Sequence, residues 1–394
     1  MQIRRNGKRR GKVWLLLALL IIAGVVLCGC YGSQPKGWSG ATAADGRLFV
    51  GSLDGRLVGV NTSDGSPLWL DEEAGTLGTS ESGVAIYGSP AVEGELVYLA
   101  GYNGKVYAFV SESGALRWVY PREGNLNSIA AGVAVSQGKV CFGCSDGSIY
   151  ALDAATGDKL WSFETGGKVW STPTADGDTL YIGAFDKKLY ALNTSDGTKR
   201  WEFEAEFEEA GGAIMSPPLV YESTVYFGSF DRYFYAVDAA SGSLRWRSEV
   251  MGGKWFWAKP VIYNNVVYAP NLDGKVYILD AASGGEVAAA VDLGNPISSA
   301  PVVVGDKVVL ATEEGNVYAL DTAGYQKGQP IIDVREESGD IPKSTSRRIY
   351  APLSASNGVV YIKAQTASED ALYAVDVARQ QTLWSRSLVI SEGD

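Results

Sequence analysis

The sequence contains no histidine among its 394 residues, and this absence limits the chemistry open to the chain. Ser-His-Asp and Cys-His catalytic arrangements need an imidazole, and so do the histidine-ligated metal sites. A haem-attachment C-x-x-C-H motif is excluded for the same reason. These reaction classes and sites are therefore not available to this protein.

Cysteine is also scarce, with four residues, two of which lie within the first 30 positions. The other two, Cys141 and Cys144, form the sequence CFGC inside a predicted strand. Three strand residues span ~10 Å and alternate between faces, whereas a disulfide needs Cα atoms within ~7 Å. We interpret both as small buried residues, and we expect no metal site and no redox pair here.

Basic residues are too few to suggest a nucleic acid partner. The first 12 residues carry six Lys and Arg, so the remaining 28 face 45 Asp and Glu, a net charge of −17. No basic stripe is visible, which argues against nucleic-acid binding.

The residues Glu202, Glu204, Glu206 and Glu208 form an acidic row that alternates with other residues in the sequence. Calcium binding by this row is the alternative to a solvated face. Same-face strand residues lie ~7 Å apart, which is too far for a compact Ca²⁺ site with ligands at about 2.3–2.6 Å. We therefore expect the row to face water.

The N-terminal segment reads as an export signal or membrane anchor over residues 1–30, followed by a linker over 31–39. Its basic start precedes 18 uncharged residues, VWLLLALLIIAGVVLCGC. The positive flank stays inside, which places the following chain on the extracytoplasmic face of a membrane. The ending Leu27-Cys28-Gly29-Cys30 resembles a bacterial lipobox and predicts lipidation of Cys30. An uncleaved helix is the alternative, and it is barely long enough to cross the ~30 Å hydrocarbon core.

One sequence unit recurs along the rest of the chain. Examples are FGCSDGSIYALDAATGDKLW at 142–161, GAFDKKLYALNTSDGTKRW at 183–201 and GSFDRYFYAVDAASGSLRW at 228–246. The typical unit has a short apolar strand marked by Ser-x-Pro or a similar sequence, an alternating strand, an Asp-Gly or Asn-Gly turn, a third strand, an Asp-x-x-[Ser/Thr]-(x)-Gly turn and a fourth strand that carries Trp. We count eight units, with approximate bounds 40–73, 84–122, 128–165, 169–207, 212–250, 256–290, 297–334 and 348–390.

Four strands in 40–45 residues are typical of a β-propeller blade. The sequence therefore predicts an all-β, eight-bladed β-propeller of four-stranded antiparallel blades over 40–390, as a monomeric ring behind the N-terminal signal or anchor. We expect the recurring tryptophans to fix each blade to its neighbour; they are Trp69, Trp118, Trp161, Trp201, Trp246 and Trp384.

Two units depart from this pattern. Ala288 stands near the Trp position in the sixth unit, and no Trp follows the seventh. We expect looser packing of the ring there. The first unit starts on its innermost strand and the eighth ends on its Trp strand. Ring closure should therefore rest on side-chain packing and not on a swapped strand.

The phrases ALDAATGDKLW (151–161) and AVDAASGSLRW (236–246) resemble the tryptophan-docking repeat of the quinoprotein, or PQQ-repeat, β-propellers. The resemblance covers nearly all of 40–390. It implies either an enzyme that holds pyrroloquinoline quinone (PQQ) and a metal over the ring axis, or a cofactor-free lipoprotein scaffold of the kind found in the outer-membrane barrel-assembly machinery. The alcohol dehydrogenases of the family carry an adjacent Cys-Cys pair, and this chain has none. No catalytic residue can be transferred.

Loops that enter the innermost strands meet around the axis of a propeller. Three positions before the proline of these strands stand Tyr87, Trp170, Met215, Trp257 and Ser298. Basic residues occupy the same loops, namely Lys168, Lys254, Lys259, Arg347 and Arg348. The sequence predicts a cationic, aromatic funnel suited to an aromatic anion or to acidic loops of a partner protein. Packing of the aromatics with solvated cations is the alternative.

The function predicted from the sequence is that of an exported, membrane-anchored propeller that binds an envelope protein or ligand without catalysis. The alternatives are a PQQ-dependent dehydrogenase with an axial quinone and Ca²⁺, and a ligand-sensing propeller. We expect no cofactor, no metal and no catalytic residue. Either a lipid on Cys30 or an uncleaved N-terminal helix would attach the protein to the membrane.

Overall fold

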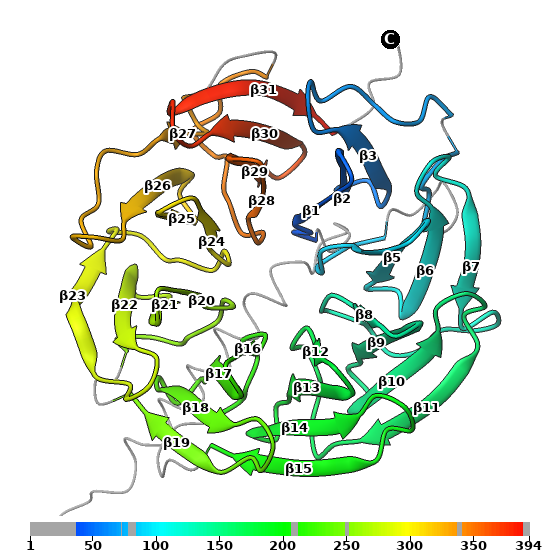
Figure 1. Cartoon of the computed structure of the whole chain (residues 1–394). Coiled ribbons are helices and arrows are strands. Elements are labelled where there is room, and N and C mark those ends of the chain that lie inside the picture. The colour runs from blue at the N-terminus through cyan, green and yellow to red at the C-terminus, as the bar shows by residue number, and fades with distance from the viewer. Residues whose placement is uncertain are drawn as a thin grey trace, which may run out of the picture. The chain divides into compact units, whose positions relative to one another are not determined.

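The computed structural model describes residues 37–71, 73–77, 84–205, 212–248, 252–336 and 341–388. The chain divides into 1–36 and 37–394. The predicted signal, with Cys30, lies outside the described residues. Within them, no helix is long and apolar enough to cross a membrane. The second unit is a ring of eight antiparallel sheets (Figure 1), so the all-β, eight-bladed propeller is confirmed.

In each blade the strands run outward in chain order from the axis to the rim. The first four blades are β1 (Ala41–Ala44), β2 (Arg47–Gly51), β3 (Leu57–Asn61); β4 (Ala91–Glu93), β5 (Leu96–Gly101), β6 (Lys105–Val110), β7 (Leu116–Tyr120); β8 (Ala134–Ser136), β9 (Lys139–Gly143), β10 (Ser148–Asp153), β11 (Lys159–Glu164); and β12 (Thr174–Asp176), β13 (Thr179–Gly183), β14 (Lys188–Asn193), β15 (Lys199–Glu204).

The other four blades are β16 (Leu219–Tyr221), β17 (Thr224–Gly228), β18 (Phe234–Asp238), β19 (Leu244–Arg247); β20 (Val261–Tyr263), β21 (Val266–Pro270), β22 (Lys275–Asp280), β23 (Glu286–Asp292); β24 (Val302–Val304), β25 (Lys307–Ala311), β26 (Asn316–Asp321), β27 (Ile332–Asp333); and β28 (Ser354–Ser356), β29 (Val359–Gln365), β30 (Asp370–Asp376), β31 (Gln381–Ser387).

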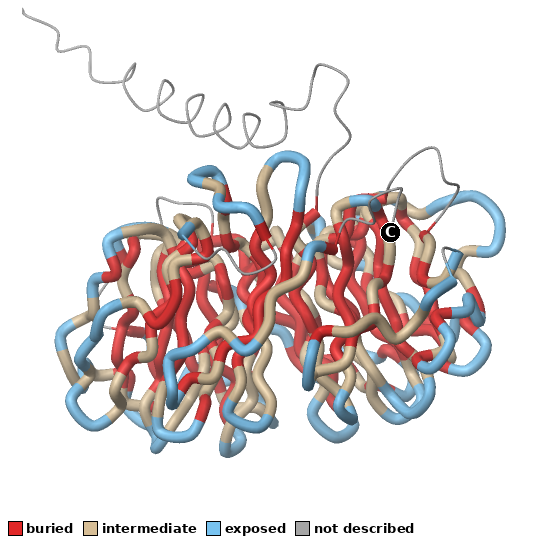
Figure 2. The backbone as a smooth tube through the Cα atoms, turned by 90° about the horizontal axis from the view of Figure 1, so that it is seen from above, coloured by how far each residue is buried: buried red, intermediate tan, exposed pale blue. Residues whose placement is uncertain are grey.

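Burial follows the order of the strands in each blade. The second and third strands are almost fully buried, as in β13 and β14, while β15 alternates between exposed and buried residues. Figure 2 shows the buried strands running through the ring and the exposed turns at its two faces. A sheet buried on both faces reads as a continuous apolar run, which explains sequences such as TLYIG and KLYAL.

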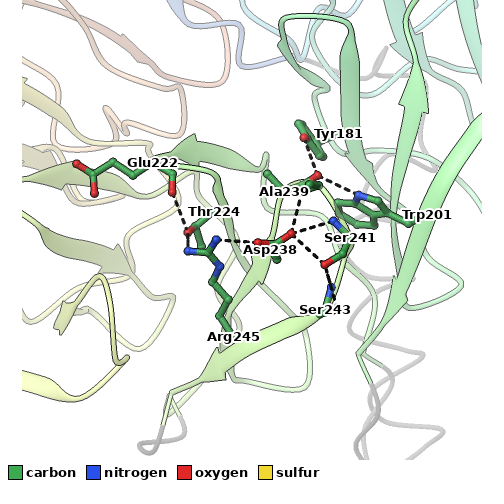
Figure 3. Close-up of polar contacts among 10 residues, drawn as sticks. Tyr181, Trp201, Glu222, Thr224, Asp238, Ala239, Ser241, Ser243 and Arg245 are labelled. Atoms are coloured by element: carbon green, nitrogen blue, oxygen red, sulfur yellow. Dashed lines mark hydrogen bonds and ion pairs between the residues drawn. The ribbon is translucent and has the colours of Figure 1, made fainter.

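The recurring tryptophans join neighbouring blades. The indole N–H of Trp201 donates to the carbonyl of Ala239 in the next blade at 3.0 Å, and Tyr181 donates to the same carbonyl (Figure 3). The Trp201 ring covers Gly242, whose added Cβ would lie 2.6 Å from it. Gly242 has φ +71°, a left-handed conformation that glycine adopts without cost.

The same contact recurs around the ring. In each case an indole N–H donates at 2.9–3.2 Å to a carbonyl in the next blade: Trp69 to Ser111, Trp118 to Ala154, Trp161 to Thr194, Trp246 to Ala281 and Trp384 to Thr62. A five-residue turn that ends in a glycine with positive φ presents each of these surfaces; it has the sequence Asp-x-x-[Ser/Thr]-Gly at 153–157, 238–242 and 280–284, and begins with Asn or Val in the other three. In Figure 3, Asp238 accepts from Ser241 and pairs with Arg245 at 2.7 Å, which holds the turn.

The two junctions without a docking tryptophan are packed in other ways. Between the sixth and seventh blades, Tyr325 lies 6.4 Å from the Tyr268 ring. Between the seventh and eighth blades lies the buried cluster with the most members, which includes Val334, Ile341 and Ile349. The expectation of looser packing is wrong for this second junction, because aliphatic side chains replace the missing ring.

Ring closure uses side chains, as expected. No strand from one end of the described chain joins the sheet at the other end. Trp384 reaches the first blade, and a buried ion pair of Lys363 and Asp370 (3.2 Å) lies beside it. Lys363 also donates to the carbonyl of Gly51, and Asp370 accepts from the amide of Leu53 at 2.9 Å. The pair therefore connects the eighth blade to the first.

The first blade departs from the four-stranded plan. It has three strands, and its outer segment contributes only the isolated bridges Val60–Pro67 and Arg56–Thr76. After Trp69 the chain turns toward the second blade, where the amide of Gly75 donates to Gly114 at 2.9 Å. The expected fourth strand is therefore interrupted in this blade.

We predict that Trp201→Ala lowers the free energy of unfolding by ~3–5 kcal/mol, as for other buried aromatic truncations. Trp201→Phe should cost only about 0.5–1.5 kcal/mol, because Tyr181 still donates to the Ala239 carbonyl. Urea unfolding followed by tryptophan fluorescence and circular dichroism measures both. Leu160→Ala, at a position 48% exposed, is the matched control. An equal small loss for all three variants would contradict the docking role.

We predict that Asp370→Asn costs ~3–5 kcal/mol, since it leaves the Lys363 ammonium buried without a counter-charge. The double variant Lys363→Met, Asp370→Leu should recover most of the loss, because it removes both buried charges. Thermal unfolding by calorimetry distinguishes these cases. A cost below about 1 kcal/mol for Asp370→Asn would show that the pair does not secure the closure.

Candidate functional site

The mouth of the ring axis is built by one backbone contact repeated in six blades. In each of these blades a hairpin joins the second and third strands. The residue at its tip donates its backbone amide to a carbonyl in the loop that enters the innermost strand of the same blade. The pairs, at 2.8–3.1 Å, are Tyr102–Ala85, Ser145–Ser128, Phe185–Lys168, Phe230–Ala213, Leu272–Trp255 and Glu313–Pro296. Each blade therefore fixes a tip residue beside a loop residue at this face of the ring.

Aromatic side chains gather at this mouth on the fourth, fifth and sixth blades. We call this set the aromatic arc: Trp170, Phe185, Phe230, Trp255 and Trp257, with Met215 beneath it. The Phe230 ring is stacked on Trp255, with 4.4 Å between the ring centres and 10° between the planes. The ring centre of Trp257 lies 5.8 Å from that of Phe230. Trp170 contacts Phe185 edge-to-face at 5.0 Å. Four of the five rings are half-buried, so they keep exposed surface.

A second aromatic group lies on the eighth, first and second blades. Trp38 contacts Tyr87 at 4.5 Å and Tyr350 at 6.2 Å, and Tyr87 contacts Tyr102 at 5.2 Å. Burial raises the pKa of Tyr87 to about 12, with a smaller contribution from Tyr102. Tyr87 therefore stays protonated at neutral pH and provides a hydroxyl group at the mouth.

The three consecutive aromatics at 255–257 divide between two environments. Phe256 is buried between blades, 5.6 Å from Phe234 and 5.3 Å from Tyr277. Trp255 and Trp257 belong instead to the aromatic arc. The loop therefore uses its middle ring for packing and directs the outer two to the mouth, as alternation in an extended segment requires.

The predicted cations are present but differ in their surroundings. The Lys168 ammonium lies 5.4 Å from the centre of the Trp170 ring, within cation–π range. Lys254 is exposed, and within the described ranges it forms no ion pair. Arg348 donates to the carbonyls of Thr345 and Arg347, so its loop already uses part of its hydrogen-bonding capacity.

Lys259 is the most unusual of these cations. It stands directly before Pro260, which precedes the innermost strand β20, and the matching positions of the fourth and fifth blades hold Thr172 and Pro217. Its side chain is half-buried, and burial lowers its pKa. No described residue is recorded as its hydrogen-bond or ion-pair partner. An amine with few protein ligands can interact with an anionic group that reaches the axis.

One carboxyl group joins this set from the seventh blade. Glu313 is half-buried, and burial raises its pKa, although Ser298, Lys254 and Arg348 act in the opposite direction. Its amide donates to Pro296, and its carbonyl accepts from Ile349. The mouth thus combines aromatic surface with three lysines, one arginine and one carboxyl group, so it can bind a ligand that has both apolar and anionic parts.

Two predicted funnel residues, Met215 and Arg347, lie differently from the expectation. Met215 is buried in the same cluster as the aromatic arc, whereas Ser298 is half-buried, as Trp170 and Trp257 are. Arg347 is 1% exposed and donates to the carbonyls of Val334 and Pro342 at 3.0 and 2.9 Å. The prediction for Arg347 is wrong, because two inward-facing carbonyls hold its guanidinium in the interior.

Several residues of the mouth were not among those predicted: Trp38, Tyr102, Phe185, Phe230, Glu313 and Tyr350. One signal was available for the hairpin tips. Phe185 and Phe230 both precede the Asp of a GxFD sequence, where an apolar ring is unusual for a turn unless another surface covers it. The contact between tip and loop could have been inferred only from the register of the blades.

The acidic and cysteine residues considered for metal or thiol chemistry lie apart from the aromatic arc. No group of three His, Cys, Asp or Glu that could hold a metal occurs in the part of the chain that the structure describes. Glu202 pairs with Lys188 and Lys199, and the rest of the acidic row lies partly outside the described residues. Cys141 and Cys144 are free and buried, and burial raises the pKa of both to about 12.

Comparison with known proteins agrees with this architecture. The profile of the PQQ_2 family, described as "Outer membrane protein assembly factor BamB", matches residues 33–144, 122–321 and 206–392. The chain belongs to this family of PQQ-repeat β-propellers.

Individual relatives match smaller parts of the chain. Outer membrane protein assembly factor BamB of Kangiella koreensis is 30% identical over 145 residues, 36% of each chain. The quinohemoprotein alcohol dehydrogenase ADH-IIG of Pseudomonas putida is 32% identical over 108 residues, 24% of this chain and 15% of that enzyme. These alignments thus cover about a third or less of the curated relatives.

Solved structures share the fold over most of the chain. The BamB crystal structure from Moraxella catarrhalis aligns with a TM-score of 0.65 at 21% identity, covering 82% of this chain and 90% of that one. A europium-containing methanol dehydrogenase aligns at 0.61 and 14% identity, covering 76% and 77%. Scaffold and enzyme members thus resemble this ring to a similar degree, and the likeness establishes the fold alone.

We predict that Lys259→Met stabilises the fold at neutral pH and that its advantage narrows as the pH rises toward 10.5. The folded pKa of Lys259 lies below its ordinary value of 10.5, so the unfolded chain binds this proton more tightly. Stability from this group therefore increases as the pH rises through the folded pKa. Urea unfolding of both proteins between pH 7 and 10.5 measures the difference. A constant difference across this range would contradict the assignment.

Proposed function

We propose that this protein is a non-catalytic binding scaffold of the cell envelope, held at the extracytoplasmic face of a membrane by its N-terminal segment. Membership of the PQQ-repeat family supports the ring architecture and the envelope setting. The basic and apolar start of the sequence supports export and attachment. Cys30 is the proposed lipidation site, with an uncleaved helix as the alternative form of attachment.

The observation that carries the proposal is the rigid, partly exposed aromatic arc at the axial mouth. Trp255 and Trp257 both stack on Phe230, and the hairpin contacts fix the backbones of Phe230 and Trp255. Aromatic side chains held in this way lose little conformational entropy on binding, and they dominate protein interfaces. The lysines nearby favour an acidic partner segment, so we propose that an envelope protein binds here through apolar and acidic side chains.

A PQQ-dependent dehydrogenase is the second candidate function. The alignment with an alcohol dehydrogenase and the structural likeness to a methanol dehydrogenase favour it. The absence of an adjacent Cys-Cys pair from the whole sequence speaks against it. The resemblance associates this pair with the alcohol dehydrogenases of the family. We therefore place binding first.

A photo-crosslinking amino acid at position 102, expressed in the source cells, tests the proposal. We expect a discrete adduct from this position, because Tyr102 lies at the axial mouth beside Tyr87. The combined Trp255→Ala and Trp257→Ala variant should reduce the adduct at least fivefold. Position 160, which is exposed on the rim, serves as the control.

Equal labelling from positions 102 and 160, or no adduct from position 102, would overturn the axial binding site. Circular dichroism of the purified tryptophan variant would establish that it is folded. Blots of membrane and soluble fractions from the same cells would test the proposed attachment, and Cys30→Ser should move the protein to the soluble fraction if a lipid holds it.

A further inference from the structure

The segment that leads into the innermost strand of the sixth blade alternates between two environments. Phe256, Ala258 and Pro260 are buried, whereas Trp257 and Lys259 between them are half-buried. The corresponding segments of the second, fourth, seventh and eighth blades alternate in the same way. Because alternate residues of an extended segment face opposite sides, Lys259 faces the same side as Trp257, which belongs to the aromatic arc.

Lys259 is one of eight matching positions, which we call the axial belt. These positions lead into the innermost strands, which surround the axis (Figure 1). Where the structure prints their contacts, neighbouring members touch: a Cβ added to Gly40 would lie 2.5 Å from Ser89 Oγ and 3.1 Å from Pro352 Cδ. Lys259 is the one charged residue of the belt. The belt consists of Gly40, Ser89, Gly132, Thr172, Pro217, Lys259, Ala300 and Pro352.

The belt offers the Lys259 ammonium no counter-charge. Its neighbours in the adjacent blades, Pro217 and Ala300, have no polar side-chain atom. Burial alone lowers the pKa of Lys259, with no carboxylate acting against it. The carboxyl group of Glu313 interacts instead with Lys254 and Arg348. An amine in this position gains from an anion that a ligand brings, because a buried charge without a partner is costly.

The other cations of the mouth have less to gain from such an anion. The ammonium of Lys168 lies over the Trp170 ring, and the guanidinium of Arg348 already donates to two carbonyls. Lys254 is exposed to water. A charge pair is stronger where water is partly excluded than at an exposed side chain. Lys259 is therefore the cation of the mouth at which an anionic group is recognised most sharply.

We propose that Lys259 is the specificity-determining residue of the axial mouth, where its ammonium binds one carboxylate of the partner protein. This proposal rests on the proposed function, because it names the group that the bound protein presents. An apolar side chain next to that carboxylate packs on the aromatic arc. Residues two apart on one face of an extended segment lie ~7 Å apart, so Trp257 and Lys259 contact groups that are close together in the partner's sequence.

Isothermal titration calorimetry with unlabelled peptides tests this proposal on the full-length protein in lipid nanodiscs. The probes are acetyl-Ser-Leu-Glu-Leu-Ser-amide and the same peptide with Gln in place of Glu. We expect the wild type to bind the Glu peptide at least tenfold more tightly, because only Glu forms the charge pair. In Lys259→Met the two peptides should bind equally. In Lys254→Met, the matched control in the same loop, the preference should stay within about twofold of the wild type.

Two further peptides identify the source of the carboxylate. They are acetyl-Ser-Leu-Leu with a free C-terminus and the same peptide with a C-terminal amide. A preference for the free acid that disappears in Lys259→Met would assign the carboxylate to a chain end. Equal binding of these two, together with the preference for Glu over Gln, would assign it to a side chain. Either preference supports the proposal only if it depends on Lys259.

The photo-crosslink from position 102 separates this proposal from the proposed function. The adduct should fall at least fivefold in Lys259→Met and less than twofold in Lys254→Met. An adduct that persists in Lys259→Met would contradict the role of Lys259 and leave the axial binding site standing. No adduct in the wild type would overturn both.

Other outcomes would also overturn the proposal. Equal affinity of the wild type for the Glu and Gln peptides, with no preference for the free chain end, would show that the mouth does not recognise a carboxylate. A preference that survives in Lys259→Met would assign the recognition to another cation. Lys259→Met removes a charge from a partly buried site, so unfolding of this variant is not expected to account for a loss of binding.

Discussion

The ring depends on the contact between an indole and a left-handed glycine of the next blade. The glycine must lack a Cβ because the ring occupies that space, as Gly242 and Trp201 show. It must also take positive φ for the Asp-x-x-[Ser/Thr]-Gly turn to close. One short phrase in the sequence therefore specifies both the turn of one blade and the docking surface for the previous one. Repetition of the phrase produces a ring because six of the eight blades present an indole to the next blade, and other apolar side chains pack at the remaining two junctions.

This arrangement separates stability from function. The docking contacts and the buried second and third strands lie between the blades and toward the rim, while the hairpin tips and entry loops meet at the axis. The tips are free to differ, and they hold Ser145, Phe185 and Glu313 in three different blades. Function on a shared fold is carried by such variable positions. The interrupted outer segment of the first blade is likewise a local departure, in a blade whose docking tryptophan is retained.

The sequence was sufficient for the fold because its signals are local and repeated. Turn residues, alternating strands and Trp positions identify each blade. The axial mouth was only partly predictable, since Phe185 and Trp170 meet through a contact between a loop and a hairpin that no short pattern encodes. Arg347 was misplaced because its charge suggested solvent, whereas the carbonyls of Val334 and Pro342 bind it inside. The interrupted first blade was missed because Leu70 follows a normal Trp segment.

We propose that the ring is a binding scaffold whose axis holds no redox cofactor. The most direct measurement is a titration of the full-length protein with PQQ and Ca²⁺, followed by dye-linked oxidation of alcohols and sugars. We expect no stoichiometric binding at tens of micromolar PQQ and no dye reduction above a protein-free control. Stoichiometric binding together with substrate-dependent dye reduction would contradict the account and identify the protein as a quinone-dependent dehydrogenase.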